Sequence, residues 1–153
     1  PGLTWAALEF VHETTDLPVL VKGVLDPRDA RLAVDHGADA VGVSTHGGRQ
    51  VDGSITAIEA LPDVVDEVGD EVPITFDSGV RRASDAYKAI ALGADSVLLG
   101  RPYAYGLAVD GGDGVRQVLA NFLAEFDLTM GLSGRDRVDA IGPDAVRHED
   151  DLR

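Results

Sequence analysis

Four short apolar runs of this chain each end in polar side chains of kinds that act in catalysis or bind anions. An imidazole can accept a proton near neutral pH, a guanidinium can hold a carboxylate or phosphate through two hydrogen bonds, and glycine lets the backbone approach a ligand. The four polar segments are Lys22, 44–50 (Ser-Thr-His-Gly-Gly-Arg-Gln), 77–82 (Asp-Ser-Gly-Val-Arg-Arg) and 100–102 (Gly-Arg-Pro).

The segment around His46 is the richest of the four, because two glycines separate this imidazole from Arg49. His46 can take a proton from a bound hydroxyl or carbon acid, and Arg49 can hold a substrate carboxylate with both arms of its guanidinium. We interpret the other histidines as incidental residues of helices or of the C-terminal tail; they are His12, His36 and His148.

Two glycine-bearing turns each carry an arginine, Gly79 with Arg81 and Gly100 with Arg101. Backbone N–H groups at the glycines and charge-assisted hydrogen bonds from the arginines suit a phosphate. A single pair of this kind is more often a turn with a solvated charge. Two pairs at corresponding strand ends favour a phosphate site, although Arg82 could instead be a surface residue of the next helix.

Lys22 follows the apolar residues of its predicted strand, so its ammonium group should lie at the edge of the sheet. From the residue type alone, three roles stay open. Lys22 could form a Schiff base with a carbonyl substrate, hold an anionic group of a cofactor, or extend its charged end from the core into water.

Apolar runs alternate along the chain with segments of helical period, as is typical of βα units and a parallel sheet. Asp26 followed by Pro27 marks the start of one helix. The pattern predicts strands at 18–22, 40–44, 72–77 and 96–100, and helices at 26–37, 56–68, 84–92 and 114–130.

Residues 29–41 and 85–97 align with one another, which makes two βα units the period of an internal repeat. This repeat predicts an α/β fold of the (β/α)8 TIM-barrel type. A complete barrel takes about 250 residues, so residues 1–134 would form about the last four βα units, and 135–153 a polar acidic tail. Active sites of such barrels lie at the carboxyl ends of the strands, and phosphate sites commonly follow strands seven and eight.

The 153 residues include 27 acidic and 13 basic side chains, a formal net charge of −14. This charge argues against nucleic acid and anionic membranes as partners. We find neither a membrane-spanning apolar run nor a signal peptide. The absence of cysteine excludes disulfides, thiolate metal sites and cysteine nucleophiles, and we expect a cytoplasmic protein.

Aspartate and arginine dominate the charged residues, with 20 Asp, 7 Glu, 11 Arg and 2 Lys. This excess of short carboxylates favours a halophilic protein, in which salt screens the self-repulsion. The alternative is an ordinary acidic soluble protein.

The strand-end motifs resemble those of the FMN-dependent α-hydroxy acid dehydrogenases and oxidases. The family carries Ser-Asn-His-Gly-Gly-Arg-Gln where this chain has Thr45 in place of the asparagine, within 44–50. Residues 77–81 and 100–101 match its two phosphate segments, and 17–23 match the strand that bears its flavin lysine. The resemblance covers about residues 16–135.

The resemblance implies FMN as cofactor and a small 2-hydroxy acid as substrate. His46 would be the base and would also contact substrate, Arg49 would anchor the substrate carboxylate, and Lys22 would face the flavin N1 and C2 carbonyl, which removes the Schiff-base role. The other implied cofactor contacts are Ser44, Asp77, Ser78, Gly79, Val80, Arg81, Gly100 and Arg101.

Several strings within the family are most similar to the lactate 2-monooxygenase branch; they are 50–53, 76–79, 100–106 and 127–134. L-lactate is therefore the leading substrate, with oxidative decarboxylation of the product as a further step. The resemblance also implies a homo-oligomer for the full-length protein.

The first four βα units of such a barrel are absent from this sequence, and with them the family's substrate-binding tyrosines and the aspartate partner of the histidine. Two hypotheses follow: the chain is the C-terminal half of an FMN-dependent oxidoreductase, or it is a truncated, catalytically silent half-barrel that keeps part of a phosphate site. A phosphosugar or nucleotide enzyme is a third reading, which leaves 46–49 unexplained. We expect the 153-residue chain alone to be inactive.

Overall fold

Four parallel strands form one sheet in which strands consecutive in sequence are neighbours in space. The computed structural model describes residues 2–152. The strands are β1 (Leu20–Val24), β2 (Ala40–Val43), β3 (Ile74–Phe76) and β4 (Ser96–Val97). The helices are α1 (Trp5–Thr14), α2 (Pro27–Asp35), α3 (Ala57–Val68), α4 (Ala83–Ala91) and α5 (Arg101–Leu132), with short 3-10 turns η1 (His46–Gly48), η2 (Val138–Ala140), η3 (Pro143–Ala145) and η4 (Glu149–Leu152).

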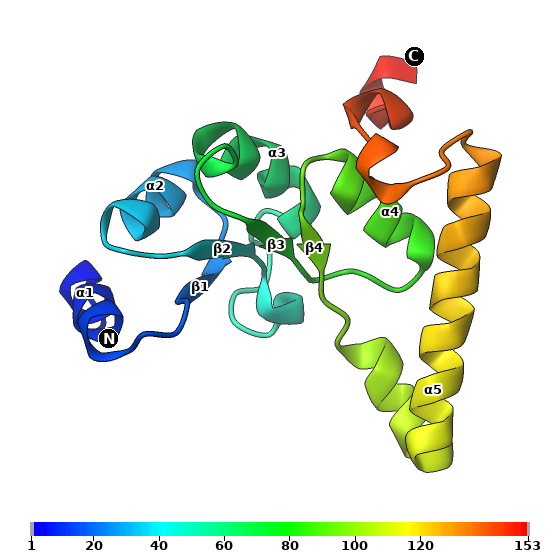
Figure 1. Ribbon diagram of the computed structural model, residues 1–153, viewed down its shortest axis with the longest axis horizontal. Coiled ribbons are helices and arrows are strands. Elements are labelled where there is room, and N and C mark those ends of the chain that lie inside the picture. Colours follow the sequence, from blue (N-terminus) through cyan, green and yellow to red (C-terminus); the bar gives the residue numbers. More distant parts are fainter. Residues whose placement is uncertain (1, 153) are drawn as a thin grey trace.

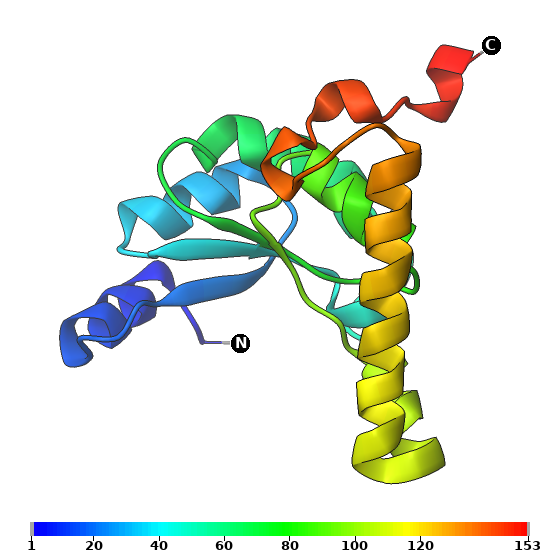
Figure 2. The same cartoon turned by 45° about the vertical axis from the view of Figure 1, so that its right-hand side comes forward.

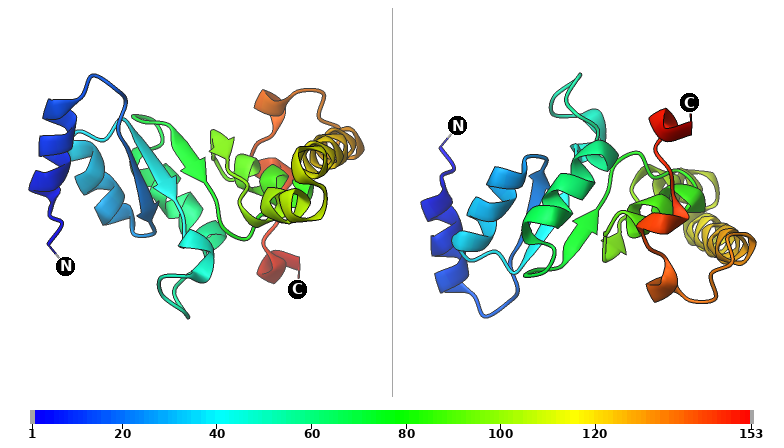
Figure 3. Two further views of the ribbon diagram at one scale, coloured as in Figure 1. Left: turned by 90° about the horizontal axis from the view of Figure 1, so that it is seen from below. Right: turned by 90° about the horizontal axis from the view of Figure 1, so that it is seen from above.

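Helices α2, α3 and α4 cover one face of the sheet and leave the strands uncovered on the other (Figures 1 and 3). Side chains alternate between the two faces of a strand, so each face has its own composition. Val41, Val43 and Ile74 are fully buried in the core that includes the helices. The opposite face carries Lys22, Thr75 and Leu20, whose side chains would each contact a Cβ at Gly42. The sheet is thus apolar towards the helices and carries both polar and apolar side chains on its open face.

The helices between strands begin where the sequence predicts. Asp26 caps α2 by accepting a hydrogen bond from the amide of Arg28, and Pro27 occupies the first turn. Thr56 and Glu59 form a reciprocal capping box at the start of α3. These two caps confirm the predicted starts and fix where the loops after β1 and β2 end.

The strands differ from the prediction in length. Apart from β1, which continues to Val24, each ends before the predicted polar residues, and β4 has only two residues. Between Lys22 and Val24 the β1–β2 register shifts, because Gly23 adopts a positive φ of 101°. Only a glycine takes this conformation without strain.

Two helices depart from the predicted set. Helix α1 was not predicted at all, and it lies at the end of the molecule beside α2 (Figure 1). Helix α5 breaks its helical dihedrals at Asp110 and Gly111; the part after the break corresponds to the predicted helix at 114–130, and the part before it begins at Arg101. Glycine at position 111 has φ 52° and allows the chain to reverse there, which produces the tall yellow limb in Figure 2.

The predicted tail contains the short turns η2, η3 and η4. Ile141 is 7% exposed and joins Tyr87 of α4 and Met130 of α5 in a second apolar cluster. This part of the tail therefore lies against α4 and α5, as Figure 2 also shows. The prediction that 135–153 is a unit separate from the barrel half stays a prediction.

Within the described residues, no helix combines the length and apolar character needed to cross a membrane.

Candidate active site at the carboxyl ends of the strands

The predicted site residues come from the carboxyl ends of all four strands. Lys22 lies in β1, Ser44 follows β2 directly, and His46 begins η1. The 77–81 segment connects β3 to α4, and Gly100 and Arg101 begin α5. Parallel strands bring these ends to the same edge of the sheet, so residues far apart in sequence become neighbours.

Asp77 is the centre of a polar cluster at this edge. Its Oδ2 lies 2.7 Å from Lys22 Nζ, and its Oδ1 accepts hydrogen bonds from the hydroxyls of Ser44 at 2.7 Å and Ser78 at 2.9 Å. Lys22 Nζ also donates to Ser44 Oγ at 2.8 Å. Ser44 is 1% exposed, whereas the Lys22 side chain is 38% exposed. Asp77 and Ser44 thus hold the ammonium group of Lys22 on its buried side, while part of the Lys22 side chain is exposed to solvent.

Burial raises the pKa of Asp77. Hydrogen bonds from Lys22, Ser44 and Ser78, together with the charge of Lys22, lower this pKa by more than burial raises it. The net result is a pKa below the ordinary value of an aspartate. Asp77 is therefore a carboxylate at neutral pH, and it accepts hydrogen bonds without competing for a proton.

Three consecutive backbone amides around His46 are held by serine hydroxyls. Ser44 Oγ accepts from the amide of His46 at 3.0 Å. Ser78 Oγ accepts from the amides of Thr45 at 3.1 Å and Gly47 at 3.0 Å. The histidine loop is therefore tied to the ends of both β2 and β3.

The His46 imidazole lies directly over Gly23 of β1. A Cβ atom at position 23 would stand 2.6 Å from His46 Cε1, which is far inside normal contact. The backbone of His46 has a positive φ of 54°. This placement at the open edge suits a base, and Gly23 is a site residue that sequence reasoning missed.

Arg49 and Arg101 both turn towards the histidine loop. Arg49 Nε donates to the carbonyl of His46 at 3.1 Å, and Arg101 donates from Nη2 to the carbonyl of Gly47 at 2.8 Å. Gly47 leaves room for this guanidinium, since a Cβ there would meet Arg101 Nη2 at 2.6 Å. Arg101 thus links the start of α5 to the loop after β2, a contact that its predicted phosphate role does not include.

The two glycine turns leave open space beside the backbone. Around Gly79, which has φ 80°, and around Gly100, a Cβ would meet nothing within 4 Å. The backbone amide of Arg81 donates to Asp85 at 2.9 Å, which fixes the turn into α4. Val80 is 7% exposed and belongs to the core, so any ligand contact there would be through its backbone.

Three arginines at this edge have no acidic partner among residues 2–152, although acidic side chains outnumber basic ones 27 to 13 in the sequence. They are Arg49, Arg81 and Arg101. Other basic side chains share this property within the same range, so the absence alone does not mark a site. Three such arginines at one strand edge nevertheless provide the positive charge that a phosphate and a carboxylate need.

His12 and His36 lie away from this edge, in α1 and at the end of α2. His12 belongs to α1 and packs against Gly37. His36 stacks on Trp5 with ring centroids 5.9 Å apart, and its Nδ1 lies 2.6 Å from a carboxylate oxygen of Glu9. His36 therefore joins α1 to α2.

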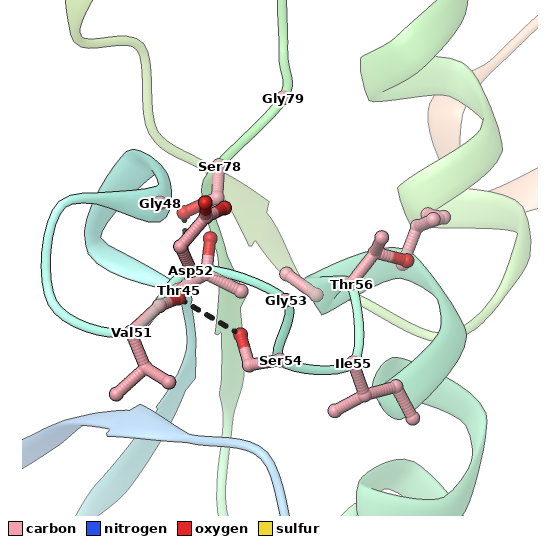
Figure 4. Close-up of a pocket in the computed structure, with 12 residues that line it drawn as sticks. Thr45, Gly48, Val51, Asp52, Gly53, Ser54, Ile55, Thr56, Ser78 and Gly79 are labelled. Atoms are coloured by element: carbon pink, nitrogen blue, oxygen red, sulfur yellow. Dashed lines mark hydrogen bonds between the residues drawn. The ribbon is translucent and has the colours of Figure 1, made fainter.

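An open pocket lies beside the histidine loop, between 45–58 and the start of the β3–α4 loop. Figure 4 shows Ser78 next to Thr45 and Gly48, with the chain from Val51 to Ile55 curving around them. Most of the residues that line the pocket lie in the segment between β2 and α3, which separates the predicted strand at 40–44 from the predicted helix at 56–68.

Residues 1–148 match the sequence profile of the FMN-dependent dehydrogenase family. The chain is 45% identical over 141 residues to an L-lactate oxidase of Lysinibacillus sphaericus, covering 92% of this chain and 36% of the relative. It is 47% identical over 150 residues to a peroxisomal (S)-2-hydroxyacid oxidase of Arabidopsis thaliana, covering 98% and 41%. The chain therefore belongs to the FMN-dependent dehydrogenase family, and it spans about two fifths of the length of these relatives.

Solved structures of related enzymes share the fold of this chain. A crystal structure of an active mutant of (S)-mandelate dehydrogenase superimposes with a TM-score of 0.92 at 42% identity, covering 95% of this chain and 41% of that one. A mandelate oxidase with (S)-4-hydroxymandelic acid gives a TM-score of 0.88 at 47% identity, covering 91% and 39%. The predicted (β/α)8 barrel class, of which this chain forms a part, is confirmed.

The residues at the strand ends fit an FMN of the kind this family uses. The open turns at Gly79 and Gly100 give a phosphate access to the backbone, and Arg81 has no carboxylate partner among the described residues. The half-exposed ammonium of Lys22 can face an electron-rich ring system. Sequence reasoning found these residues by type and position, but the central position of Asp77 emerges only when β1, β2 and β3 lie side by side.

Proposed function

We propose that the protein containing this chain oxidises a 2-hydroxy acid to the corresponding 2-oxo acid with FMN as electron acceptor. The observation that carries the proposal is the hydrogen-bonded cluster of Lys22, Ser44 and Asp77 below the His46 loop, at the strand edge where barrel enzymes have their active sites. The family membership supports the use of FMN.

FMN supplies an isoalloxazine ring that accepts two electrons. On the protein side, Arg81, Arg101 and the backbone at Gly79 and Gly100 would hold the phosphate. The ammonium group of Lys22, which Asp77 keeps in place, would supply positive charge to the ring. Ser44 and Asp77 are the polar residues beneath Lys22 at the strand ends. Ser78 and Val80 belong to the loop between β3 and α4, whose turn at Gly79 is proposed to bind the phosphate.

His46 acts as the base that removes a proton from the substrate as its two electrons leave. The ring lies at the open edge, and its backbone amide is fixed by Ser44. A neutral imidazole nitrogen has the lone pair that this step requires. His46 becomes an imidazolium, which can also hold the substrate until the 2-oxo acid leaves.

Arg49 binds the substrate carboxylate. In the described structure its Nε donates to the His46 carbonyl, which leaves the terminal nitrogens of the guanidinium for an anionic ligand. Two parallel hydrogen bonds to a carboxylate would then orient the 2-hydroxyl group towards His46. The same contact selects 2-hydroxy acids over simple alcohols.

L-lactate is the proposed substrate, because the strings 50–53, 76–79, 100–106 and 127–134 are most similar to the lactate 2-monooxygenase branch, and because an L-lactate oxidase is among the relatives. Decarboxylation of the product to acetate is part of this narrower proposal. We further propose a cytoplasmic, salt-adapted homo-oligomer for the full-length protein.

The test uses the full-length protein that contains this chain, with FMN bound. Anaerobic mixing with L-lactate, glycolate and mandelate in a stopped-flow spectrophotometer should bleach the flavin, and fastest with L-lactate. His46→Ala should abolish bleaching while substrate still perturbs the oxidised flavin spectrum, because binding through Arg49 is intact. Bleaching at the parent rate in His46→Ala would show that the base is another residue.

A truncated, inactive half-barrel is the alternative. Strands β1 and β4 are the two edges of the described sheet, and such edges are normally paired in a closed barrel. We therefore expect the 153-residue chain with added FMN to oxidise lactate no faster than free FMN, at low and high salt. Clear turnover by the isolated chain would show that the missing half is dispensable.

A further inference from the structure

Two non-glycine residues among those described have a positive φ, and both are in the active-site cluster. They are His46, with φ 54°, and Ser78, with φ 83°. L-residues rarely adopt this left-handed conformation, and strained backbone of this kind persists only where surrounding contacts hold it. The two strained residues therefore need an explanation in terms of their contacts.

The Ser78 hydroxyl uses its full hydrogen-bonding capacity on the protein. A hydroxyl has one proton to donate and two lone pairs. Ser78 Oγ donates to Asp77 Oδ1 and accepts from the amides of Thr45 and Gly47. The hydroxyl therefore has no capacity left for a ligand, and any FMN contact at this position would be through the backbone.

The amide of Gly47 belongs to the peptide group that follows His46, so Ser78 holds that group directly, and through the amide of Thr45 it also holds the residue before His46. The peptide group that precedes His46 is held by Ser44. Because the peptide groups on both sides of His46 are held, its φ and ψ are restricted, and with them the direction of its side chain. A glycine at position 78 would adopt φ 83° without strain. Serine at this position is strained, but unlike glycine it has a hydroxyl that accepts two hydrogen bonds from the histidine loop.

We propose that Ser78 is a positioning residue for His46: its hydroxyl clasps the loop so that the imidazole stays over Gly23 in the orientation needed for proton removal. The proposal rests on the proposed function in so far as His46 is the base. It places a determinant of base orientation in the loop after β3, whereas the base itself lies in the loop after β2.

Two variants of the full-length protein with FMN separate this role from simple stability. Ser78→Gly removes the hydroxyl and relieves the backbone strain, whereas Ser78→Ala removes the hydroxyl and keeps the strain. We expect both to speed hydrogen exchange in a peptide covering 44–48, by about tenfold at the Thr45 and Gly47 amides, because each loses its acceptor.

Ser78→Gly should retain the parent Tm or exceed it, yet slow flavin reduction at saturating lactate by about tenfold or more, with a smaller change in the lactate Kd. A purely structural role would move Tm and rate in the same direction. Thr15→Ala is the matched control, because the Thr15 hydroxyl accepts a hydrogen bond from the amide of Leu17 far from the site. It should speed exchange at Leu17 and leave flavin reduction unchanged.

If hydrogen exchange of the 44–48 peptide is as slow in both Ser78 variants as in the parent, the Ser78 hydroxyl does not hold the histidine loop, and the proposal is overturned. Faster exchange with parent-like flavin reduction, measured beside a His46→Ala protein that has lost reduction, would overturn the positioning role and leave the proposed function standing. Parent-like reduction in His46→Ala would overturn the proposed function, and with it the role of Ser78 in catalysis.

Discussion

Substituting Gly23 by alanine should damage proton removal more than it damages the fold. Gly23 has φ 101°, and a Cβ there would lie 2.6 Å from His46 Cε1. Two separate effects follow from these two numbers. The backbone conformation becomes strained for any L-residue, and the imidazole must move away from the new methyl group.

The sizes of the two effects can be worked out separately. The left-handed conformation costs an alanine roughly 1–2 kcal/mol relative to glycine, so unfolding should become easier by about that amount. Restoring ordinary contact requires the ring to retreat by roughly 1 Å, and a misplacement of that size can cost on the order of a hundredfold in rate. We therefore expect a modest loss of stability and a large loss of flavin reduction.

Gly93 offers a closely matched control at a remote position. It also has φ 101°, and its Cβ would also meet its nearest atom at 2.6 Å, but that atom is Cγ1 of Val65 on α3 rather than the imidazole. Gly93→Ala should lose a comparable amount of unfolding free energy in urea and reduce flavin at close to the parent rate.

The assay is anaerobic stopped-flow reduction of the full-length, FMN-loaded proteins with L-lactate, together with urea unfolding of each. Equal slowing in Gly23→Ala and Gly93→Ala would attribute the effect to general destabilisation. Parent-rate reduction in Gly23→Ala would refute the reasoning, because the His46 ring would then tolerate displacement or would not be the base.

Three further results are expected. Arg81→Ala and Arg101→Ala should each weaken FMN binding about tenfold or more, measured by flavin fluorescence, since each removes a charge-assisted hydrogen bond worth about 1.5–3 kcal/mol; unchanged affinity in both would contradict the phosphate site. Arg49→Lys should raise the lactate Kd and slow reduction, because lysine cannot copy the planar fork; an unchanged Kd would contradict the carboxylate contact. The folded pKa of Asp77 is below its unfolded value of about 3.9, so its carboxylate stabilises the fold above that pH and loses this contribution as pH falls through the folded pKa. In urea unfolding, the free energy of unfolding of Asp77→Asn should therefore fall less steeply than that of the parent as the pH is lowered below about 4. An equally steep fall in the variant and the parent would refute that role of Asp77.

Local signals in the sequence were sufficient to predict the four strands and the helices that follow each of them. Asp26 with Pro27 and the Thr56 capping box act on the first turn of their own helices, so their effect can be read without knowing the rest of the fold. The positions of Lys22, Ser44 and His46 followed from the rule that parallel strands present their carboxyl ends at one edge. Their proximity in the structure agrees with that rule.

Features that depend on contacts between distant segments were not predicted. Helix α1 is linked to α2 through the stacking of Trp5 on His36, a pairing that leaves no periodic signal in the sequence. The burial of Ile141 likewise depends on α4 and α5 meeting beside the tail. The bond from Arg101 to Gly47 spans 54 positions, and nothing in either local sequence indicates it.

The conformations of His46 and Ser78 show why the site itself is the hardest part to predict. A glycine in the sequence, such as Gly23, Gly47 or Gly79, indicates that the backbone can adopt a positive φ there. Serine and histidine normally have a negative φ, so their residue type gives no such signal. Here the left-handed conformation of each is compensated by polar contacts made through Asp77 and the serine hydroxyls, which only the assembled sheet provides. The contacts formed where the strand ends meet outweigh the local backbone preference of these two residues, and this is the place where the proposed base His46 must be held in one orientation.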